Sequence, residues 1–283
     1  MSPTKDDIII CIERLKTKDR FHYIESVNKL KSYGDEAMEK FVSALQDANE
    51  FEGMYLLNAA VEIGTQIIPY LLRDLNKMNT TVKCYAIAAL GEIRDTSVAE
   101  NLIIAIGDPN PLVRQTVIQA MEKIGPEIFK DSLIKALDDA NQQVRGYAAG
   151  ILGDIKAEEA VPMLLLLIRD TDPEIKAMAA RSLGKIGNPC AVPKLIKMLN
   201  DNMPMVVSAT LLALGDIRTE ECFEPVTTCL KHEHELVRAA AVKSIGRMRN
   251  RKGIQILKTV LNDENIIIRE LANETVKFLE SEE

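Results

Sequence analysis

The chain has 283 residues, a net charge of −7, and 47% hydrophobic but only 4% aromatic residues, with no Trp. The negative charge argues against a general nucleic-acid binder, which needs a basic face to displace counterions from phosphates. No apolar run approaches the ~20 residues of a membrane span, and the polar start of the chain does not resemble a signal peptide. Five scattered Cys, an odd number, predict free thiols in a reducing compartment, so we expect a cytoplasmic protein.

The first four predicted helices occupy about 4–18, 21–33, 36–48 and 51–63. The first pair fits the later pattern poorly and carries extra charge, as expected of a terminal cap. The fourth helix already matches the second helix of the next pair, with Tyr55 and Glu62 aligned on Tyr85 and Glu92.

From about residue 65 the sequence repeats with a fixed period of thirty-one residues, without insertion or deletion. An aliphatic residue, usually followed by a base, opens the second helix of each pair at Val82, Val113, Val144, Ile175, Val206, Val237 and Ile268. Such a period indicates stacked helical pairs, each burying its apolar face against its neighbours. We therefore expect an all-α solenoid of about nine antiparallel helix pairs in a single domain over 1–283. Pairs at 1–34 and 250–283 would cap the stacked repeats at 35–249.

Two features recur at fixed places when Val82 and its equivalents are numbered as position 0. Glycine occupies position +9 inside the second helix, where it costs about 1 kcal/mol against Ala. We interpret these glycines as sites where neighbouring helices approach closely, in a series that Glu122 interrupts: Gly91, Gly153, Gly184, Gly215 and Gly246.

The base at position +1 lies within the apolar arc of the helix and therefore needs a partner. A carboxylate six residues earlier in the turn could cap the helix and accept from that base. The predicted pairs are Asp108–Arg114, Asp139–Arg145, Asp170–Lys176 and Asp263–Arg269, with breaks where Val207 replaces the base and His232 the acid.

The turns, and the second helices that follow them, resemble those of a known repeat family. The turn pattern D-x-D/N-P-x-V-R, at Asp108–Arg114 and Asp170–Lys176, and the A-x-x-A-L-G-x-I that follows are similar to HEAT repeats, especially the short class named for phycobilisome lyases. The match covers about residues 50–280. It implies a right-handed superhelix whose second helices line the concave face, usually for protein–protein interaction, and it fixes no function.

Enzymes with related repeats provide specific tests. Deoxyhypusine hydroxylases bind iron through His-Glu pairs on second helices, but this chain has only three His, and its residues after the +1 base include Gln115, Gly146 and Ala177. DNA-alkylation-repeat glycosylases need a basic, aromatic-rich face, which the composition does not offer. An accessory enzyme or chaperone of the phycobilin-lyase type remains the alternative to a non-catalytic scaffold.

A zinc site is the one metal site that the residue types suggest, from Cys222, Cys229, His232 and His234. The two Cys lie seven residues apart in an apolar stripe, and the His follow beyond the end of that helix. We therefore expect buried thiols and a solvated turn, with no metal and no cofactor.

Positions +3 and +10 face away from the apolar arc and predict the partner-binding side. The candidates are Tyr55, Tyr85, Tyr147 and Met178 at +3, with Glu62, Glu92 and Asp154 at +10. The Tyr would anchor a peptide or helical segment of another protein, and the acids would favour basic residues on it. Two other interpretations stay open: Tyr as packing residues, and alternating +10 charges as salt bridges between repeats.

One basic segment is a second candidate contact, for an acidic partner, nucleic acid or another copy of the chain. It comprises Lys243, Arg247, Arg249, Arg251 and Lys252. It could equally be a solvated loop between repeats.

Overall fold

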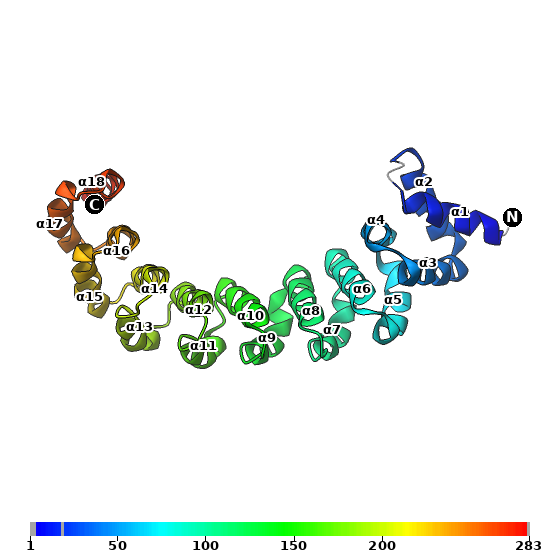
Figure 1. The fold of residues 1–283 in the computed structure, drawn as a ribbon, viewed down its shortest axis with the longest axis horizontal. Coiled ribbons are helices and arrows are strands. Elements are labelled where there is room, and N and C mark those ends of the chain that lie inside the picture. Colours follow the sequence, from blue (N-terminus) through cyan, green and yellow to red (C-terminus); the bar gives the residue numbers. More distant parts are fainter. Residues whose placement is uncertain (1–3, 18–19, 282–283) are drawn as a thin grey trace. The chain divides into compact units, whose positions relative to one another are not determined.

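The computed structural model describes residues 4–17 and 20–281, and its secondary structure there is entirely helical (Figure 1). The chain forms two compact units, Met1–Ser132 and Leu133–Glu283, which divide within α9 (Lys130–Ala136). The described helices α1 to α18 form nine pairs, which confirms the predicted all-α solenoid. The single domain stays a prediction. None of the described helices is both long and apolar enough to cross a membrane.

The first unit begins with four long helices and then adopts the repeating pattern. Its α-helices are α1 (Lys5–Leu15), α2 (Arg20–Tyr33), α3 (Asp35–Asp47), α4 (Glu50–Ile63), α5 (Ile68–Asp74), α6 (Thr80–Ile93), α7 (Ala99–Ala105) and α8 (Pro111–Ile124). Its short 3-10 helices are η1 (Gly64–Ile67), η2 (Leu75–Lys77), η3 (Thr96–Val98) and η4 (Pro126–Phe129).

The second unit repeats a short first helix and a long second helix. Its α-helices after α9 are α10 (Gln142–Asp154), α11 (Val161–Leu167), α12 (Pro173–Ile186), α13 (Val192–Met198), α14 (Pro204–Ile217), α15 (Phe223–Thr228), α16 (Glu235–Met248), α17 (Lys252–Lys258) and α18 (Ile266–Ser281). The 3-10 helices are η5 (Glu158–Ala160), η6 (Pro189–Ala191), η7 (Glu220–Cys222), η8 (Cys229–Lys231) and η9 (Thr259–Asn262).

Polar side chains in the turns start the second helices. The Asp172 side chain accepts from the Glu174 amide at 2.8 Å, and Asn110 accepts from the Leu112 amide at 2.9 Å. In α4, the Asn49 cap and Glu52 form a reciprocal capping box. These caps satisfy amides that have no partner inside the helix.

The first helices are short, and a 3-10 turn precedes most of them. In α11 and α13, Pro162 and Pro193 occupy the second helical position. A proline there removes no intrahelical hydrogen bond, so it fixes the start of the helix.

Second helices pack on second helices within each unit, α6 on α8 in the first, and α10, α12, α14, α16 and α18 in succession in the second. The glycines at +9 are the contact points. A Cβ on Gly184 would lie 2.6 Å from the Ala213 Cα, and one on Gly91 would lie 2.8 Å from the Ala120 Cα. No side chain fits at such distances, which confirms the predicted close approaches. The interrupting Glu122 is exposed, in the last long helix of the first unit.

Several second helices end on a left-handed residue that is not glycine. Arg94, Lys156, Arg218 and Arg249 have φ of 57°, 52°, 61° and 53°. Gly187 takes the equivalent place after α12 with φ 79°. An L-residue there costs roughly 1–2 kcal/mol, and a basic side chain beside the helix C-terminus offsets part of it through the helix dipole.

Candidate protein-interaction surface

A row of ion pairs joins neighbouring repeats through the turns that precede the second helices. Each pair links a base at +1 to an Asp 25 residues later, in the next repeat. The distances are 2.7 Å for Lys83–Asp108, and 2.8 Å for Arg145–Asp170, Lys176–Asp201 and Arg238–Asp263. These side chains are largely shielded from solvent, so the row holds the stack together.

The predicted pairing of base and carboxylate within one repeat is wrong. Within a repeat, an arginine at +1 donates to the backbone carbonyl of the Asp instead, as Arg145 Nη1 does to Asp139 O at 2.7 Å and Arg269 Nη1 to Asp263 O at 2.6 Å. Nor does this carboxylate cap the helix. Its Oδ1 accepts from the amide two residues on, as Asp170 does from Asp172 at 2.9 Å, and the next polar residue is the cap.

The two breaks in the row belong to the same step between neighbouring repeats. Val207 and His232 have the same separation in sequence as Arg238 and Asp263, so they occupy the two ends of one missing ion pair. Val207 is fully buried, and His232 Nδ1 accepts from the His234 amide at 3.0 Å, as an Asp does elsewhere. Because the base and the acid are both replaced here, no charged side chain is left without its partner at this step.

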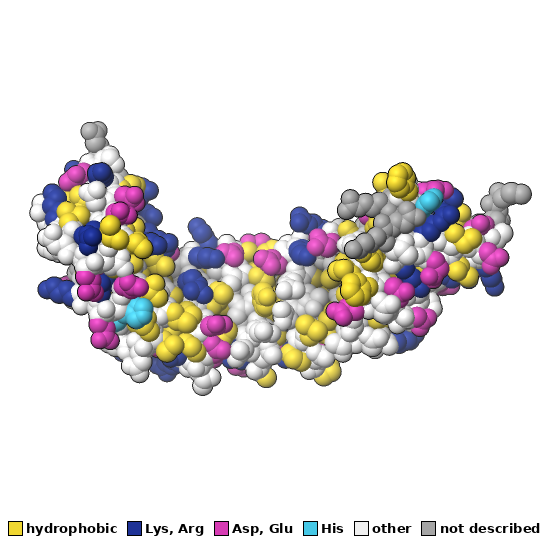
Figure 2. Space-filling model, turned by 45° about the horizontal axis from the view of Figure 1, so that its top comes forward, with side chains coloured by type: hydrophobic (Ala, Val, Ile, Leu, Met, Phe, Trp, Pro, Cys, Tyr) yellow, Lys and Arg dark blue, Asp and Glu magenta, His cyan; other side chains and the backbone are white. Residues whose placement is uncertain are grey.

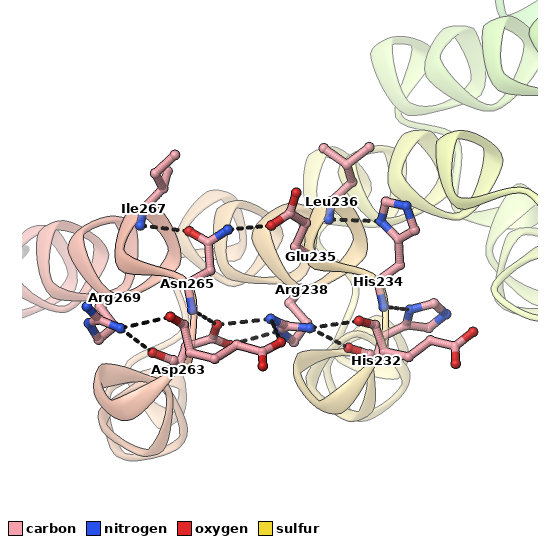
Figure 3. A network of polar contacts seen from close by, with 11 residues as sticks. His232, His234, Glu235, Leu236, Arg238, Asp263, Asn265, Ile267 and Arg269 are labelled. Carbon is pink, nitrogen blue, oxygen red and sulfur yellow. Dashed lines mark hydrogen bonds and ion pairs between the residues drawn. The ribbon is translucent and has the colours of Figure 1, made fainter.

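Arg238 makes the most extensive contacts in the row (Figure 3). Its Nε and Nη2 donate to the Asp263 carboxylate at 2.8 and 3.0 Å, and its Nη1 donates to the His232 and Glu233 carbonyls, both at 3.0 Å. The Arg238 side chain is only 8% exposed, so removing one partner would leave a buried charge.

The row lowers the pKa of its carboxylates. Hydrogen bonding from Arg238 holds the pKa of Asp263 below its usual value, against the effect of burial. For Asp170, burial raises the pKa, but hydrogen bonds from the Asp172 amide and the Arg145 side chain outweigh it, and the pKa lies below its usual value. Both carboxylates therefore stay ionised at neutral pH.

Position +10 carries a second set of ion pairs, between residues one full repeat apart along the second helices. Lys123 pairs with Glu92 at 2.5 Å and Arg247 with Asp216 at 2.7 Å, and Lys185 pairs with Asp154. The alternating charges are thus used between repeats, as one interpretation of the sequence had it. Glu62 differs, because it is exposed and has no ion pair among the described residues.

The predicted aromatic residues of position +3 lie in different surroundings. Tyr85 packs its ring on Gly53 of α4 and donates through its hydroxyl to the Glu50 carbonyl at 3.1 Å, so it serves helix packing. Tyr55 is half-buried, and its hydroxyl has no partner among the described residues. In the second unit, Tyr147 is 41% exposed and Met178 is half-buried.

A stripe on α4 is the most exposed aromatic surface beside a predicted site residue. Phe51 is 74% exposed and precedes Tyr55 by four residues, which places both on one face of the helix with Glu62 eleven residues on from Phe51. We call Phe51, Tyr55 and Glu62 the α4 stripe. Phe51 lies outside positions +3 and +10 and was therefore not predicted from the sequence, although its i, i+4 spacing from Tyr55 is visible there.

The basic segment is partly committed to internal contacts. Arg247 pairs with Asp216, Lys252 pairs with Glu220 at 2.7 Å, and Arg249 lies over the Phe278 ring at 5.7 Å. Lys243 and Arg251 are exposed and form no ion pair with any described residue.

The candidate zinc residues serve the fold. Burial raises the pKa of the Cys222 and Cys229 thiols, which keeps them protonated at neutral pH. His234 Nδ1 accepts from the Leu236 amide at 3.2 Å and caps α16. Within the described ranges, no group of three or more His, Cys, Asp or Glu is arranged to hold a metal ion.

Comparisons with known proteins agree on the repeat. A family model described as HEAT repeats matches residues 68–137, 130–213 and 192–277. No curated protein matches the chain.

Solved structures of distant sequence share the fold. An engineered protein is 18% identical, with 97% of this chain and 89% of that chain covered and a TM-score of 0.55. The Escherichia coli protein YibA is 21% identical over 92% of this chain and 98% of that chain, with a TM-score of 0.59. A mutant of Kap121p is 15% identical over 98% of this chain and 38% of that chain, with a TM-score of 0.66. At these identities the likeness shows the fold alone.

Proposed function

The chain belongs to the HEAT-repeat family, and from that premise we propose that it is a non-catalytic scaffold whose first unit binds a segment of another protein on the α4 stripe. Solenoids of this kind offer an extended surface of second helices, and protein binding is the role such surfaces usually have. The partner segment carries basic residues next to an apolar or aromatic anchor.

The observation that carries the proposal is an exposed aromatic on the same helix face as a carboxylate without an ion pair. The 74% exposed Phe51 contributes nothing to the core, and Glu62 has no basic partner in the described ranges. Aromatic anchors flanked by charge are the usual centre of a protein interface.

The charge of the first unit supports a basic partner. Residues 1–132 contain 15 Lys and Arg against 20 Asp and Glu, a net charge of −5, whereas residues 133–283 contain 20 against 22. An acidic unit attracts a basic segment during encounter and orients it on binding.

Contacts between repeats remove three residues from the predicted partner-binding site. Tyr85 and Glu92 are engaged in the packing of the stack, and Asp154 is paired with Lys185. We therefore place the partner's anchor at Phe51 and Tyr55 and its basic residue at Glu62, with Tyr147 and Met178 outside this site.

The test is quantitative affinity capture from the source cell, with proteins identified by mass spectrometry. Wild type is compared with Phe51→Ser, Tyr55→Ala and Glu62→Lys, and with Leu166→Ser as a matched control on a first helix, where the side chain is 59% exposed. We expect a protein enriched by wild type and the control to be lost with the three α4 variants. Full retention by helical, folded α4 variants would refute the site. A purified protein that bound a tetrapyrrole with an absorption shift would favour the lyase alternative instead.

A further inference from the structure

The second unit carries a row of exposed apolar side chains that no internal contact explains. Met205, Leu236 and Ile267 occupy the same repeat position, one residue before position 0, and are 37%, 56% and 67% exposed. Met203 and Ile266 beside them are 44% and 58% exposed. We call these five residues the C-terminal apolar ridge. Within the second unit it is confined to three repeats, because the same position holds Gln143 in α10 and Glu174 in α12.

The helix starts hold this ridge rigidly. The amides of Leu236 and Ile267 donate to the caps His234 and Asn265 at 3.2 and 2.9 Å. Figure 3 shows the two side chains pointing the same way, away from the row formed by Asp263, Arg238 and His232. Figure 2 shows hydrophobic side chains gathered beside the histidines of the second unit.

The ridge residues have a regular spacing. Helices α14, α16 and α18 pack directly on one another, and packed helices lie roughly 8–10 Å apart. A partner α-helix that crosses them places side chains of one face at a similar interval when they are seven residues apart, because seven residues rise about 10.5 Å. Apolar residues at i, i+7 and i+14 of one helix would therefore meet Met205, Leu236 and Ile267 in turn.

The charge around the ridge favours a basic helix over a second copy of the chain or an anionic membrane as its occupant. Residues 232–235 and 263–265, at the starts of α16 and α18, carry three exposed carboxylates, Glu233, Glu235 and Glu264, and no Lys or Arg. Of these three, only Glu264 is contacted by a guanidinium, that of Arg238. Symmetric pairing with a second copy would set this acidic rim against itself, and an anionic membrane would be repelled by it. A helix with basic residues beside its apolar stripe is attracted.

We propose that the C-terminal apolar ridge is a docking site for an amphipathic α-helix of another protein, with leucine-like residues every seven positions and Lys or Arg on the flank. This site lies within the second unit and does not depend on the α4 stripe. A scaffold with both would hold two protein segments.

The test uses a labelled helical peptide of about 21 residues, three heptads, with Leu at i, i+7 and i+14 and Lys beside them. Binding to the full chain is measured by fluorescence anisotropy at physiological salt. One comparison peptide spaces the Leu five residues apart, so that they fall on different faces, and another replaces Lys by Glu. The variants are Leu236→Ser and, as a matched control, Leu112→Ser at the same repeat position in α8, where the side chain is 52% exposed. Circular dichroism checks that both remain helical.

We expect the heptad-spaced basic peptide to bind wild type and Leu112→Ser equally and to bind Leu236→Ser at least tenfold more weakly, the loss of one buried Leu contact. The two comparison peptides should bind at least tenfold more weakly to wild type. Equal binding to both variants, or no preference among the peptides, would overturn the proposal. So would a wild-type dimer in sedimentation that Leu236→Ser abolishes, because the ridge would then bind a second copy. Adsorption to anionic vesicles that this variant abolishes would assign the ridge to a membrane and overturn it as well.

Discussion

Two glycine-to-alanine substitutions in the second unit are expected to differ in their effect on stability. A Cβ on Gly184 would lie 2.6 Å from the Ala213 Cα and 2.8 Å from its Cβ, so α12 and α14 must move apart. Overpacking of this kind costs about 1–3 kcal/mol. A Cβ on Gly150 would meet only the Met178 Sδ, at an ordinary 3.7 Å.

Helix propensity acts on both substitutions in the same way. Ala is more favourable than Gly inside a helix by about 0.5–1 kcal/mol, which is the whole effect expected for Gly150→Ala. The same gain only reduces the cost for Gly184→Ala. The difference in unfolding free energy between the two variants therefore isolates the close approach, and we expect it to be about 1–3 kcal/mol.

Urea unfolding followed by far-ultraviolet circular dichroism measures this difference. Gly150→Ala should raise the midpoint above wild type, and Gly184→Ala should fall below Gly150→Ala with a similar slope. If both variants were stabilised equally, α12 and α14 would not be in contact at this glycine, and the account of the packing would be wrong.

Three further predictions use the same assay. A double-mutant cycle of Asp170→Ala with Arg145→Ala should give a coupling free energy of about 1.5–3 kcal/mol. The cycle of Asp170→Ala with Lys176→Ala should give almost none. The opposite result would mean that Asp170 pairs with the base of its own repeat. The ionised Asp170 should stabilise the fold above its unfolded pKa of about 3.9, and this stabilisation should be lost as the pH falls through its lower folded pKa. The difference in unfolding free energy between wild type and Asp170→Asn should therefore shrink below about pH 4. A constant difference would contradict the lowered pKa. Arg218→Gly should stabilise the protein by up to about 1 kcal/mol, because Gly187 takes the equivalent left-handed place, and a loss of stability would mean that the dipole interaction dominates.

The exact period made the fold predictable from the sequence, and the same regularity concealed the pairing of the turns. Because the repeat has a constant length, an Asp that lies six residues before one base also lies at a fixed distance after the base of the previous repeat. Spacing alone cannot separate the two choices, since they differ only in how the repeats stack. The joint change at Val207 and His232 was the signal in the sequence that favoured pairing between repeats.

The candidate site was less predictable because exposure depends on what packs over each side chain. Tyr55 and Tyr85 share a repeat position, yet only Tyr85 finds a glycine, Gly53, on the neighbouring helix to receive its ring. Phe51 reads as an ordinary apolar residue in the sequence, and only the packing of α4 shows that nothing covers it. The exposure of the C-terminal apolar ridge is likewise visible only in the structure.

The most direct test of the scaffold account is photocrosslinking from the α4 stripe. Benzoylphenylalanine in place of Phe51 keeps an aromatic ring at the proposed anchor, and the same residue in place of Leu166 is the control. After irradiation in an extract of the source cell, position 51 should give one dominant protein adduct, and the attached peptide should contain more Lys and Arg than Asp and Glu. An adduct formed equally from both positions, or an acidic attached peptide, would contradict binding of a basic segment at the α4 stripe.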